Sequence, residues 1–264
     1  MDLQLKGKTA FITGSTAGIG FATAKLLLQE GANVIINGRK ESSVSTAVEK
    51  LKKLVPNTEV KGVSADFSSI NEIEVLLTKI PSTDILINNV GIYTSQTFFD
   101  TTDEDWLKQI EVNVLSGVRL SKYFLPKMLQ KKWGRIIFIS SECASLVPED
   151  LIAYSTTKAA VLALSRGLSQ LTSGTDVTVN TLIPGSTLTE GAEQFLSNMA
   201  EKENKTRVQV ENDFFEKVRT SSLLQRFTSV EEIANTIAFY ASPLSSATNG
   251  AAIKMEGGSM GGIL

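Results

Sequence analysis

Seven short runs of apolar and β-branched residues recur along the chain, and stretches with a helical spacing of apolar residues separate them. The strongest runs are continuous rather than alternating, which is typical of strands buried on both faces of a sheet. Strands are therefore predicted at residues 8–13, 33–37, 59–66, 84–89, 135–140, 176–184 and 250–255. Helices are predicted at residues 18–30, 40–54, 69–79, 103–130, 152–172 and 229–241. This alternation favours an α/β fold, a doubly wound parallel sheet of about seven strands with helices on both faces.

Residues 190–222 interrupt this rhythm of strands and helices. Apolar residues there flank the charge run EKENKTR at 201–207. One interpretation is a pair of solvated helices with a polar connection. The other is a mobile cover over a ligand site, because insertions of this length in α/β folds often serve that purpose. The pattern leaves both open; its apolar positions are Phe195, Leu196, Met199, Phe214, Phe215 and Val218.

The first predicted strand runs into a glycine-rich turn, TGSTAGIG at residues 13–20, which opens the first predicted helix. Gly14, Gly18 and Gly20 allow a tight turn and let a ligand approach the backbone closely. The amides and the dipole at the start of the helix favour a pyrophosphate. A plain strand-to-helix turn is the alternative, but the strand–turn–helix context favours a dinucleotide site.

Composition narrows the functional classes. The chain has 264 residues, 42% of them hydrophobic and 20% charged, which suits one large α/β domain or two small ones. It has no histidine and a single cysteine, Cys143, so an internal disulfide is excluded and no metal site is expected. A net charge of −2 offers no basic field for nucleic acid. No apolar run approaches the ~20 residues that cross a bilayer, and the start lacks a secretory signal pattern, so we expect a cytoplasmic protein.

A tyrosine and a lysine lie four residues apart in YSTTK, residues 154–158. Residues i and i+4 share a helix face, so Lys158 can bring its ammonium near the Tyr154 oxygen. A free phenol has a pKa near ~10 and is a poor base at neutral pH, but a neighbouring cation favours the phenolate. The pair can therefore replace histidine as an acid/base device, although the same spacing also occurs on ordinary helix surfaces.

Six motifs occur in a fixed order along the chain: TGSTAGIG, NNVG at 88–91, VNV at 112–114, ISS at 139–141, YSTTK and PGSTLT at 184–189. In their order and spacing the chain resembles the short-chain dehydrogenases/reductases, in their compact single-domain form with a Rossmann-like sheet. The resemblance covers essentially the whole chain, from the first strand to MEGG at 255–258, and implies a single domain over residues 1–264. One departure is Val90, where alanine is usual in the family; we expect it to shift packing rather than function.

The resemblance implies a catalytic set of Ser141, Tyr154, Lys158 and Asn113, with Ser140 as the structural neighbour of the serine. Ser141 would hydrogen-bond the substrate oxygen and stabilise a developing alkoxide. Tyr154 would transfer the proton, and Lys158 would also hold the ribose hydroxyls of the nicotinamide nucleotide. Asn113, inside the long predicted helix, would serve a water relay behind the lysine.

The resemblance also implies cofactor contacts. Asp66, after the third strand, resembles the family's acidic residue at the adenine ring, although it could simply cap the next turn. Asn89 and Gly91 would line the adenosine ribose, and Thr189 would bind the nicotinamide carboxamide, with Thr187 as a weaker candidate. The full set is Gly14, Ser15, Thr16, Gly18, Ile19, Gly20, Arg39, Asp66, Phe67, Asn89, Gly91, Tyr154, Lys158, Pro184, Gly185, Thr187 and Thr189.

The second strand predicts which cofactor is preferred. A carboxylate at its end would bind the adenosine ribose 2′-hydroxyl and repel a 2′-phosphate, but that position is Gly38. The next residue is Arg39, whose planar guanidinium suits a phosphate, and Lys40 adds charge. Arg39 could instead project into solvent. The carboxylate that would repel a 2′-phosphate is absent, and the guanidinium that would attract one is present. We therefore expect NADP(H) as the cofactor, with NAD less favoured.

These features favour an NADP(H)-dependent oxidoreductase that interconverts a ketone and a secondary alcohol on a small organic substrate. An acyl-carrier-protein 3-oxoacyl thioester reductase is the alternative within the same class. A nucleotide-binding regulator that has lost turnover is the alternative from another class. The pocket is expected from residues 92–98, with Ser95 and Gln96, and from 142–151 and 187–222. An uncharged, moderately apolar substrate is expected from Phe98, Phe99, Leu146, Val147, Phe195 and Met199.

Assembly is expected as well. The helices at 103–130 and 152–172 carry more apolar residues than one sheet face needs: Trp106, Leu107, Leu115, Leu120, Phe124, Leu162, Leu164 and Leu168. The resembled family uses these two helices to build a homodimer that pairs into a homotetramer, and closed symmetric assembly is common.

Overall fold

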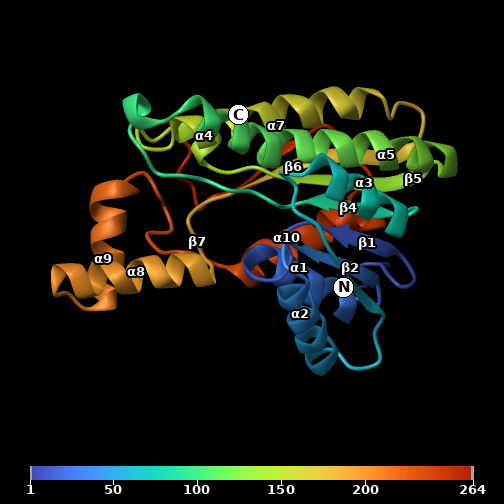
Figure 1. Ribbon diagram of the computed structural model, residues 1–264, viewed down its shortest axis with the longest axis horizontal. Helices are drawn as coiled ribbons and strands as arrows, with labels where there is room; N and C mark the ends of the chain where they lie inside the picture. Colours follow the sequence, from blue (N-terminus) through green and yellow to red (C-terminus); the bar gives the residue numbers. More distant parts are fainter. Residues whose placement is uncertain (1, 263–264) are drawn as a thin grey trace.

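The computed structural model describes residues 2–262. Its centre is a seven-stranded sheet of the order β3-β2-β1-β4-β5-β6-β9 (Figure 1), and every neighbouring pair is parallel. The strands are β1 (Thr9–Ile12), β2 (Asn33–Gly38), β3 (Val60–Ser64), β4 (Ile85–Asn88), β5 (Trp133–Ile139), β6 (Asp176–Pro184) and β9 (Ala252–Met255). All seven predicted strands are confirmed, and so is the doubly wound parallel sheet.

The direction in which strands are added reverses between β1 and β4. From β1 the chain adds β2 and β3 on one side, then returns to the other side of β1 and adds β4 onward. The carboxyl ends of β1 and β4 therefore lie side by side, and the Thr13 N–H donates to the Ile87 carbonyl oxygen at 3.0 Å. Ligands of open α/β sheets bind at such switch points, because the loops there diverge and leave a crevice.

Helices cover both faces of the sheet because successive strand residues point to opposite sides. In β1, Ala10 and Ile12 pack into one layer and Phe11 into the other. The first layer includes α1 (Gly18–Gln29), α2 (Glu41–Leu54) and α10 (Val230–Ala241). The second includes α3 (Ile70–Lys79), α5 (Ser116–Lys131) and α7 (Ile152–Gln170). Phe124 of α5 is fully buried, with its ring centroid 6.2 Å from that of Phe11; burial of such a side chain contributes about 1.5–3 kcal/mol.

The helix predicted at 103–130 is interrupted. It consists of α4 (Asp103–Ile110), a π-helical turn at Glu111–Leu115, and α5. Thr102 and Asp105 form a reciprocal capping box that starts α4. A π-helical turn holds an extra residue within the helix and often marks a functional site. Here it contains Asn113, which is buried.

Residues 190–222, the cover segment, form a helical hairpin that projects from the sheet (Figure 1). It contains α8 (Glu190–Glu203), α9 (Arg207–Asp213) and a π-helical turn at Phe214–Val218. Leu196, Val210 and Phe215 of the hairpin are buried. Two strands that the sequence did not predict, β7 (Thr187–Leu188) and β8 (Thr228–Ser229), pair in parallel where the hairpin leaves and rejoins the fold. Each has only two residues, too few for a periodic pattern.

Three short helical turns complete the fold: Phe98–Asp100, α6 (Cys143–Leu146) and Pro243–Ser245. Within residues 2–262, none of the helices combines the length and apolarity that a membrane span requires.

Candidate active site

The turn after β1 has no room for side chains at two of its glycines. Gly14 has φ of +59°, which side chains rarely adopt, and a Cβ there would lie 3.0 Å from the Val90 Cα. A Cβ on Gly20 would lie 2.6 Å from the Gly14 carbonyl oxygen and 2.7 Å from Asn89 Nδ2. The close approach of this turn to the end of β4 therefore depends on glycine.

A hollow of about 420 Å³ opens beside this turn at the ends of β1, β2 and β3. Of the expected cofactor residues, those that line it are Gly14, Thr16, Arg39, Asp66, Phe67, Asn89 and Gly91. Lys108 of α4 also lines it, and the sequence analysis missed this residue because α4 is remote in sequence from these strands. The hollow thus presents two cations, Arg39 and Lys108.

Asp66 serves two purposes in this hollow. Its carboxylate accepts hydrogen bonds from the Ser68 N–H at 2.8 Å and the Ser68 hydroxyl at 2.7 Å, so the turn-capping alternative is confirmed although Asp66 also lines the hollow. Burial raises the pKa of Asp66, but the Ser68 hydrogen bonds and the charges of Arg39 and Lys108 outweigh it and hold the pKa below its ordinary value.

A second hollow of about 450 Å³ adjoins the first, and Asn89 and Gly91 line both. It lies at the carboxyl ends of β4, β5 and β6. The other expected residues that line it are Ile19, Ser141, Tyr154, Lys158, Pro184, Gly185, Thr187 and Thr189. The Thr189 hydroxyl also accepts from the Ala192 N–H at 3.2 Å and caps α8.

Three expected cofactor residues, Ser15, Gly18 and Gly20, line neither hollow. Ser15 is fully buried, and its hydroxyl donates to the Ile12 carbonyl oxygen at 2.7 Å. The Gly18 N–H donates to Glu190 Oε2 at 2.9 Å, so the first residue of α8 places a carboxylate at the start of α1. Helix amides favour an anion there. This link could not be predicted from the sequence, because 172 positions separate Gly18 from Glu190.

The side chains of Asn113 and Lys158 both lie close to Gly91. The Asn113 side chain accepts from the Ile92 N–H at 2.8 Å and donates to the Ile92 carbonyl oxygen at 2.9 Å. It also donates to the Thr157 hydroxyl at 2.9 Å. Lys158 is 4% exposed, and its Nζ donates to the Ile139 carbonyl oxygen at 2.8 Å. A Cβ on Gly91 would lie 3.2 Å from Lys158 Nζ and 3.7 Å from Asn113 Oδ1. The structure therefore brings the predicted lysine and asparagine together.

Burial governs the proton affinities of the Tyr154–Lys158 pair. Burial raises the pKa of Tyr154, with smaller increases from Cys143, Tyr93 and Glu142, while a hydrogen bond with Ser141 acts in the opposite direction. Burial also lowers the pKa of Lys158 to about 8. The expected lowering of the tyrosine pKa by the lysine is therefore wrong for the protein's own groups, because desolvation of the phenolate dominates. The phenol keeps its proton at neutral pH.

The serines at the end of β5 differ in role. The Ser140 hydroxyl donates to the Lys158 carbonyl oxygen at 2.8 Å and is buried, as expected for a structural neighbour. Ser141 faces the second hollow, hydrogen-bonds Tyr154, and accepts from the Cys143 N–H at 3.2 Å. Ser141 and Tyr154 thus present their hydroxyls together.

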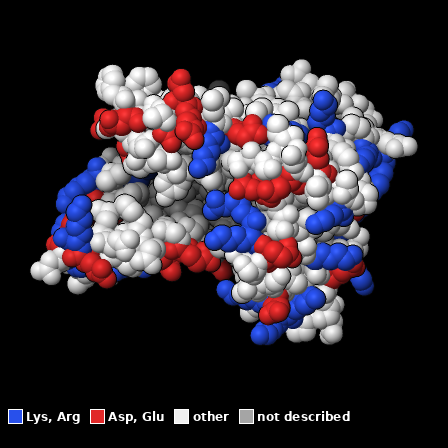
Figure 2. Space-filling model, in the orientation of Figure 1, with Lys and Arg blue, Asp and Glu red and all other residues white. Residues whose placement is uncertain are grey.

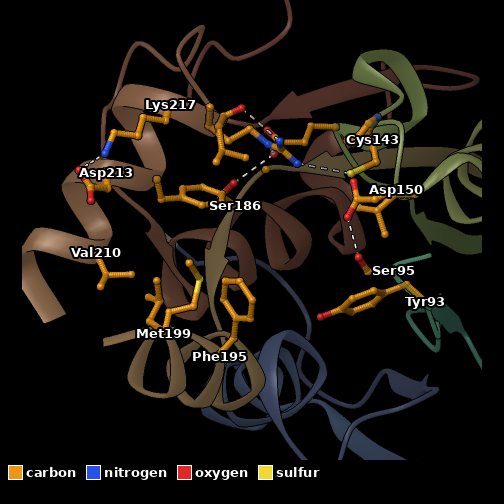
Figure 3. A pocket seen from close by; sticks show the side chains of 18 of the residues that line it. Tyr93, Ser95, Cys143, Asp150, Ser186, Phe195, Met199, Val210, Asp213 and Lys217 are labelled. Carbon is orange, nitrogen blue, oxygen red and sulfur yellow. Dashed lines mark hydrogen bonds and ion pairs between the residues drawn. The ribbon is translucent and has the colours of Figure 1, made fainter. Parts of the chain in front are cut away.

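A third and larger cavity, of about 600 Å³, shares Ser141 and Tyr154 with the second hollow. Figure 2 shows the molecule hollowed between the α8–α9 hairpin and the rest of the chain. Phe195 and Met199 line the cavity, and Tyr93 lies on its other side with its ring 5.7 Å from that of Tyr154 (Figure 3). The cover segment therefore forms a wall of this cavity.

The expectations for this pocket are partly wrong. Ser95 lines the cavity, whereas the expected residues Gln96, Phe98, Phe99, Leu146 and Val147 do not. The sequence analysis did not single out Glu142 and Arg219, which line the cavity as an ion pair with Arg219 Nε 2.8 Å from Glu142 Oε1. Within residues 2–262, no group of three or more acidic, cysteine or histidine side chains is arranged to hold a metal ion.

Comparison with known proteins identifies the family. A sequence model of the short chain dehydrogenases matches residues 8–205. The uncharacterized oxidoreductase YvaG of Bacillus subtilis (strain 168) is 45% identical over 258 residues, which cover 98% of each chain. L-sorbose reductase from Gluconobacter frateurii, solved with NADPH and L-sorbose, matches with a TM-score of 0.92 at 28% identity over 100% of each chain. A 3-oxoacyl (acyl-carrier-protein) reductase from Agrobacterium tumefaciens C58, solved with NADP, gives 0.85 at 30% identity, with 97% of this chain and 96% of that chain covered. The chain therefore belongs to the short-chain dehydrogenase/reductase family of oxidoreductases.

Proposed function

We propose that this protein is an NADP(H)-dependent oxidoreductase that interconverts a ketone and a secondary alcohol on a small organic molecule. One observation carries the proposal: Ser141 and Tyr154 lie where the second hollow meets the 600 Å³ cavity. A hydroxyl pair at that junction can touch a substrate in the cavity and a cofactor in the hollow at once. We further propose that one domain supplies both.

The two smaller hollows fit an extended dinucleotide. They adjoin along Asn89 and Gly91, and the absence of a Cβ on Gly91 leaves room for Lys158 Nζ at the junction of the two hollows. Arg39 and Asp66 would hold the adenosine end, and Thr189 the nicotinamide end. Such a cofactor supplies the hydride that a ketone needs on carbon.

The protein's own residues manage the oxygen of the substrate. Ser141 donates a hydrogen bond to the carbonyl and stabilises charge that develops on its oxygen. Tyr154 gives that oxygen its proton, and its raised pKa keeps the proton available at neutral pH. Lys158 would hold the ribose and, with Asn113, would belong to the relay by which the phenol regains a proton.

The charges in the first hollow, which would hold the adenosine end of the cofactor, favour NADP(H) over NAD(H). Arg39 and Lys108 line it, and Gly38 brings no carboxylate to the end of β2. A 2′-phosphate would gain charge-assisted hydrogen bonds from the guanidinium. The similar L-sorbose reductase was solved with NADPH, which supports the same choice.

A 3-oxoacyl thioester reductase is the second candidate. It is favoured by the similarity to a 3-oxoacyl (acyl-carrier-protein) reductase and by the apolar wall of Phe195, Met199 and Val210, which would suit an acyl chain. A regulator without turnover is the third, since the fold alone does not decide function.

A substrate panel separates these candidates. Purified protein is mixed with NADPH and, separately, with simple ketones, hydroxylated ketones and a 3-oxoacyl thioester, and the loss of NADPH absorbance is followed. We expect turnover of ketones. Turnover of the thioester alone would establish the second candidate, and tight NADPH binding without any turnover would establish a regulator.

The cover segment is expected to respond to the cofactor. Glu190 contacts Gly18, and Thr189 lines the second hollow, which would hold the nicotinamide end of the cofactor. A bound cofactor would therefore touch the start of α8 directly. We expect trypsin to cut the α8–α9 turn, after Lys202, Lys205 or Arg207, more slowly with NADPH present. Cleavage after Lys53, which lines neither hollow, is the internal control. If NADPH slows cleavage equally at the turn and after Lys53, or does not slow cleavage at the turn, the hairpin is a rigid surface element.

Assembly into a homodimer or homotetramer is proposed through α5 and α7. An apolar groove runs along them, lined by Val118, Leu125, Pro126, Leu129, Leu164, Leu168 and Leu171. The expectation that Leu120 and Phe124 contribute is wrong, because both are fully buried in the core.

Light scattering tests this assembly. We expect a mass two or four times the 28.5 kDa of one chain at micromolar concentration. A glutamate in place of Leu168 should lower that mass, because it would bury an unpaired charge in the contact. The matched control is Leu54→Glu on exposed α2, which should change nothing. A wild-type mass of one chain contradicts the proposal.

A further inference from the structure

The most buried ion pair among residues 2–262 joins the cover segment to the floor of the large cavity. Glu142 follows Ser141 and has a side chain 3% exposed, and Arg219 ends the hairpin with a side chain 13% exposed. Arg219 Nε donates to Glu142 Oε1 at 2.8 Å, and the Ser186 hydroxyl donates to the same oxygen at 3.1 Å. Desolvation makes such a pair a weak source of stability, so its place in the cavity points to another role.

The pair leaves hydrogen-bonding capacity unused on both sides. Glu142 Oε2 is buried and has no hydrogen-bond partner in the described part of the chain. Arg219 has five donor hydrogens. Among residues 2–262, its terminal nitrogens hydrogen-bond the Val218 carbonyl oxygen at 3.4 Å and the Cys143 sulfur at 3.9 Å. Because unsatisfied buried polar groups are costly, a ligand that supplies both missing partners would be bound selectively.

The pair stands at the reacting end of the cavity. Glu142 is adjacent to Ser141 in the chain, and its charge acts on the Tyr154 hydroxyl. Figure 3 shows Ser186 and Cys143, which contact the pair, across the pocket from Phe195 and Met199. The pair therefore places polar groups beside Ser141, opposite the apolar side chains of Phe195 and Met199, while the charged Lys205, Asp213 and Lys217 of the hairpin also line the cavity.

Charge decides which group the pair fits. Glu142 already neutralises Arg219, and the two other cations that line the cavity, Lys205 and Lys217, pair with Asp213 at 2.6 and 2.8 Å. A carboxylate on the ligand would face Glu142 and an ammonium would face Arg219, so both are opposed. A hydroxyl can accept from Arg219 and donate to Glu142 Oε2 at once. The terminal torsion of glutamate is broad, and a rotation that brings Oε2 to the ligand also moves Oε1, which accepts from Arg219 and Ser186.

We propose that Glu142 and Arg219 select α-hydroxy ketones, substrates that carry a hydroxyl on the carbon next to the carbonyl. This inference rests on the proposed ketone reduction and names its substrate class. The proposed substrate is uncharged, as expected from the sequence, and it carries one polar group, the hydroxyl that Glu142 and Arg219 recognise.

Two ketones of equal size test the proposal: 1-hydroxy-2-hexanone, and 3-heptanone, in which a methyl replaces the hydroxyl. We expect wild-type kcat/KM to favour the hydroxy ketone at least about 100-fold, because a site built to bind a hydroxyl rejects its apolar analogue strongly. Arg219→Met should reduce that preference at least about tenfold, chiefly by lowering kcat/KM for the hydroxy ketone. The change between wild type and variant is decisive, since it cancels the intrinsic activation of the carbonyl by the hydroxyl.

Two further variants guard against local damage. Lys217→Met makes the same chemical change at a cation that contacts Asp213 instead of Glu142, and it should leave the preference unchanged. The double variant Glu142→Gln with Arg219→Met removes both charges together, so no unpaired charge stays buried, and it should show the same loss of preference as Arg219→Met.

A readout without turnover separates this inference from the proposed function. Calorimetric titration with 1,2-hexanediol, in the presence of NADPH, which cannot take a hydride from the diol, should show binding that weakens at least about tenfold in Arg219→Met. If neither ketone is reduced, the proposed function fails, and the titration still decides the hydroxyl site. Equal wild-type and Arg219→Met affinities for the diol, or a preference between the ketones that Arg219→Met leaves intact, would overturn the proposal.

Discussion

Tyr154→Phe should abolish turnover and leave NADPH affinity within about threefold of wild type. The substitution removes only the phenolic oxygen, which carries the proton, and leaves the ring that packs against Tyr93. Positioned proton transfer typically contributes ~10²-fold or more to a rate, so we expect kcat to fall at least about 100-fold. Steady-state kinetics and a fluorescence titration with NADPH measure the two effects.

Tyr93→Phe is the matched control, because Tyr93 borders the same cavity and loses the same atom. It should change kcat by no more than about threefold. Lys158→Ala, by contrast, should damage both kcat and NADPH affinity, since it removes the proposed ribose contact as well as the buried ammonium. Retention of more than roughly a tenth of wild-type activity by Tyr154→Phe would refute the acid/base assignment.

Exchanging the end of β2 should reverse the cofactor preference. The wild type is expected to favour NADPH by kcat/KM, and Gly38→Asp with Arg39→Leu should favour NADH, because a carboxylate binds the ribose hydroxyls and repels a 2′-phosphate. Loss of a charge-assisted contact typically costs about 1.5–3 kcal/mol, so a shift of at least about tenfold is expected.

The structure refines this design. A Cβ at Gly38 would lie 2.6 Å from Thr16 Cγ2, so an aspartate there needs room. Thr16→Ser removes that methyl and keeps the hydroxyl, and the triple variant is the form to test. Lys40→Leu is the control, because Lys40 adjoins Arg39 but does not line the hollow. Wild-type kcat/KM values that are equal, or that favour NADH, would contradict the NADP(H) assignment.

Features that depend on local sequence were predictable. The continuous apolar runs define the strands because a strand buried on both faces needs no polar face. The glycines of residues 13–20 identify the turn because Gly14 and Gly20 have no space for a side chain. The motif residues Ser141, Tyr154 and Lys158 are brought together because Ser141 follows β5 and the other two lie on α7, and all three line the second hollow.

Features that depend on contacts between distant parts of the sequence could not be predicted. A helical pattern over 103–130 cannot show the π-helical turn that holds Asn113, nor that Leu120 and Phe124 enter the core while Leu107 is 66% exposed. The links between Gly18 and Glu190 and between Glu142 and Arg219 join segments that only the hairpin brings together. The desolvation that raises the tyrosine pKa likewise exists only in the folded chain.

The central claim is that the protein passes a hydride from NADPH to a carbonyl carbon while Tyr154 protonates the oxygen. Its most direct test uses NADPH that carries deuterium at the transferred position, with 1-hydroxy-2-hexanone and 3-heptanone as acceptors. Mass spectrometry of the products should find deuterium on the carbinol carbon for the wild type and only a trace for Tyr154→Phe. Alcohol that forms without deuterium, or equal labelled yields from both proteins, would contradict the account.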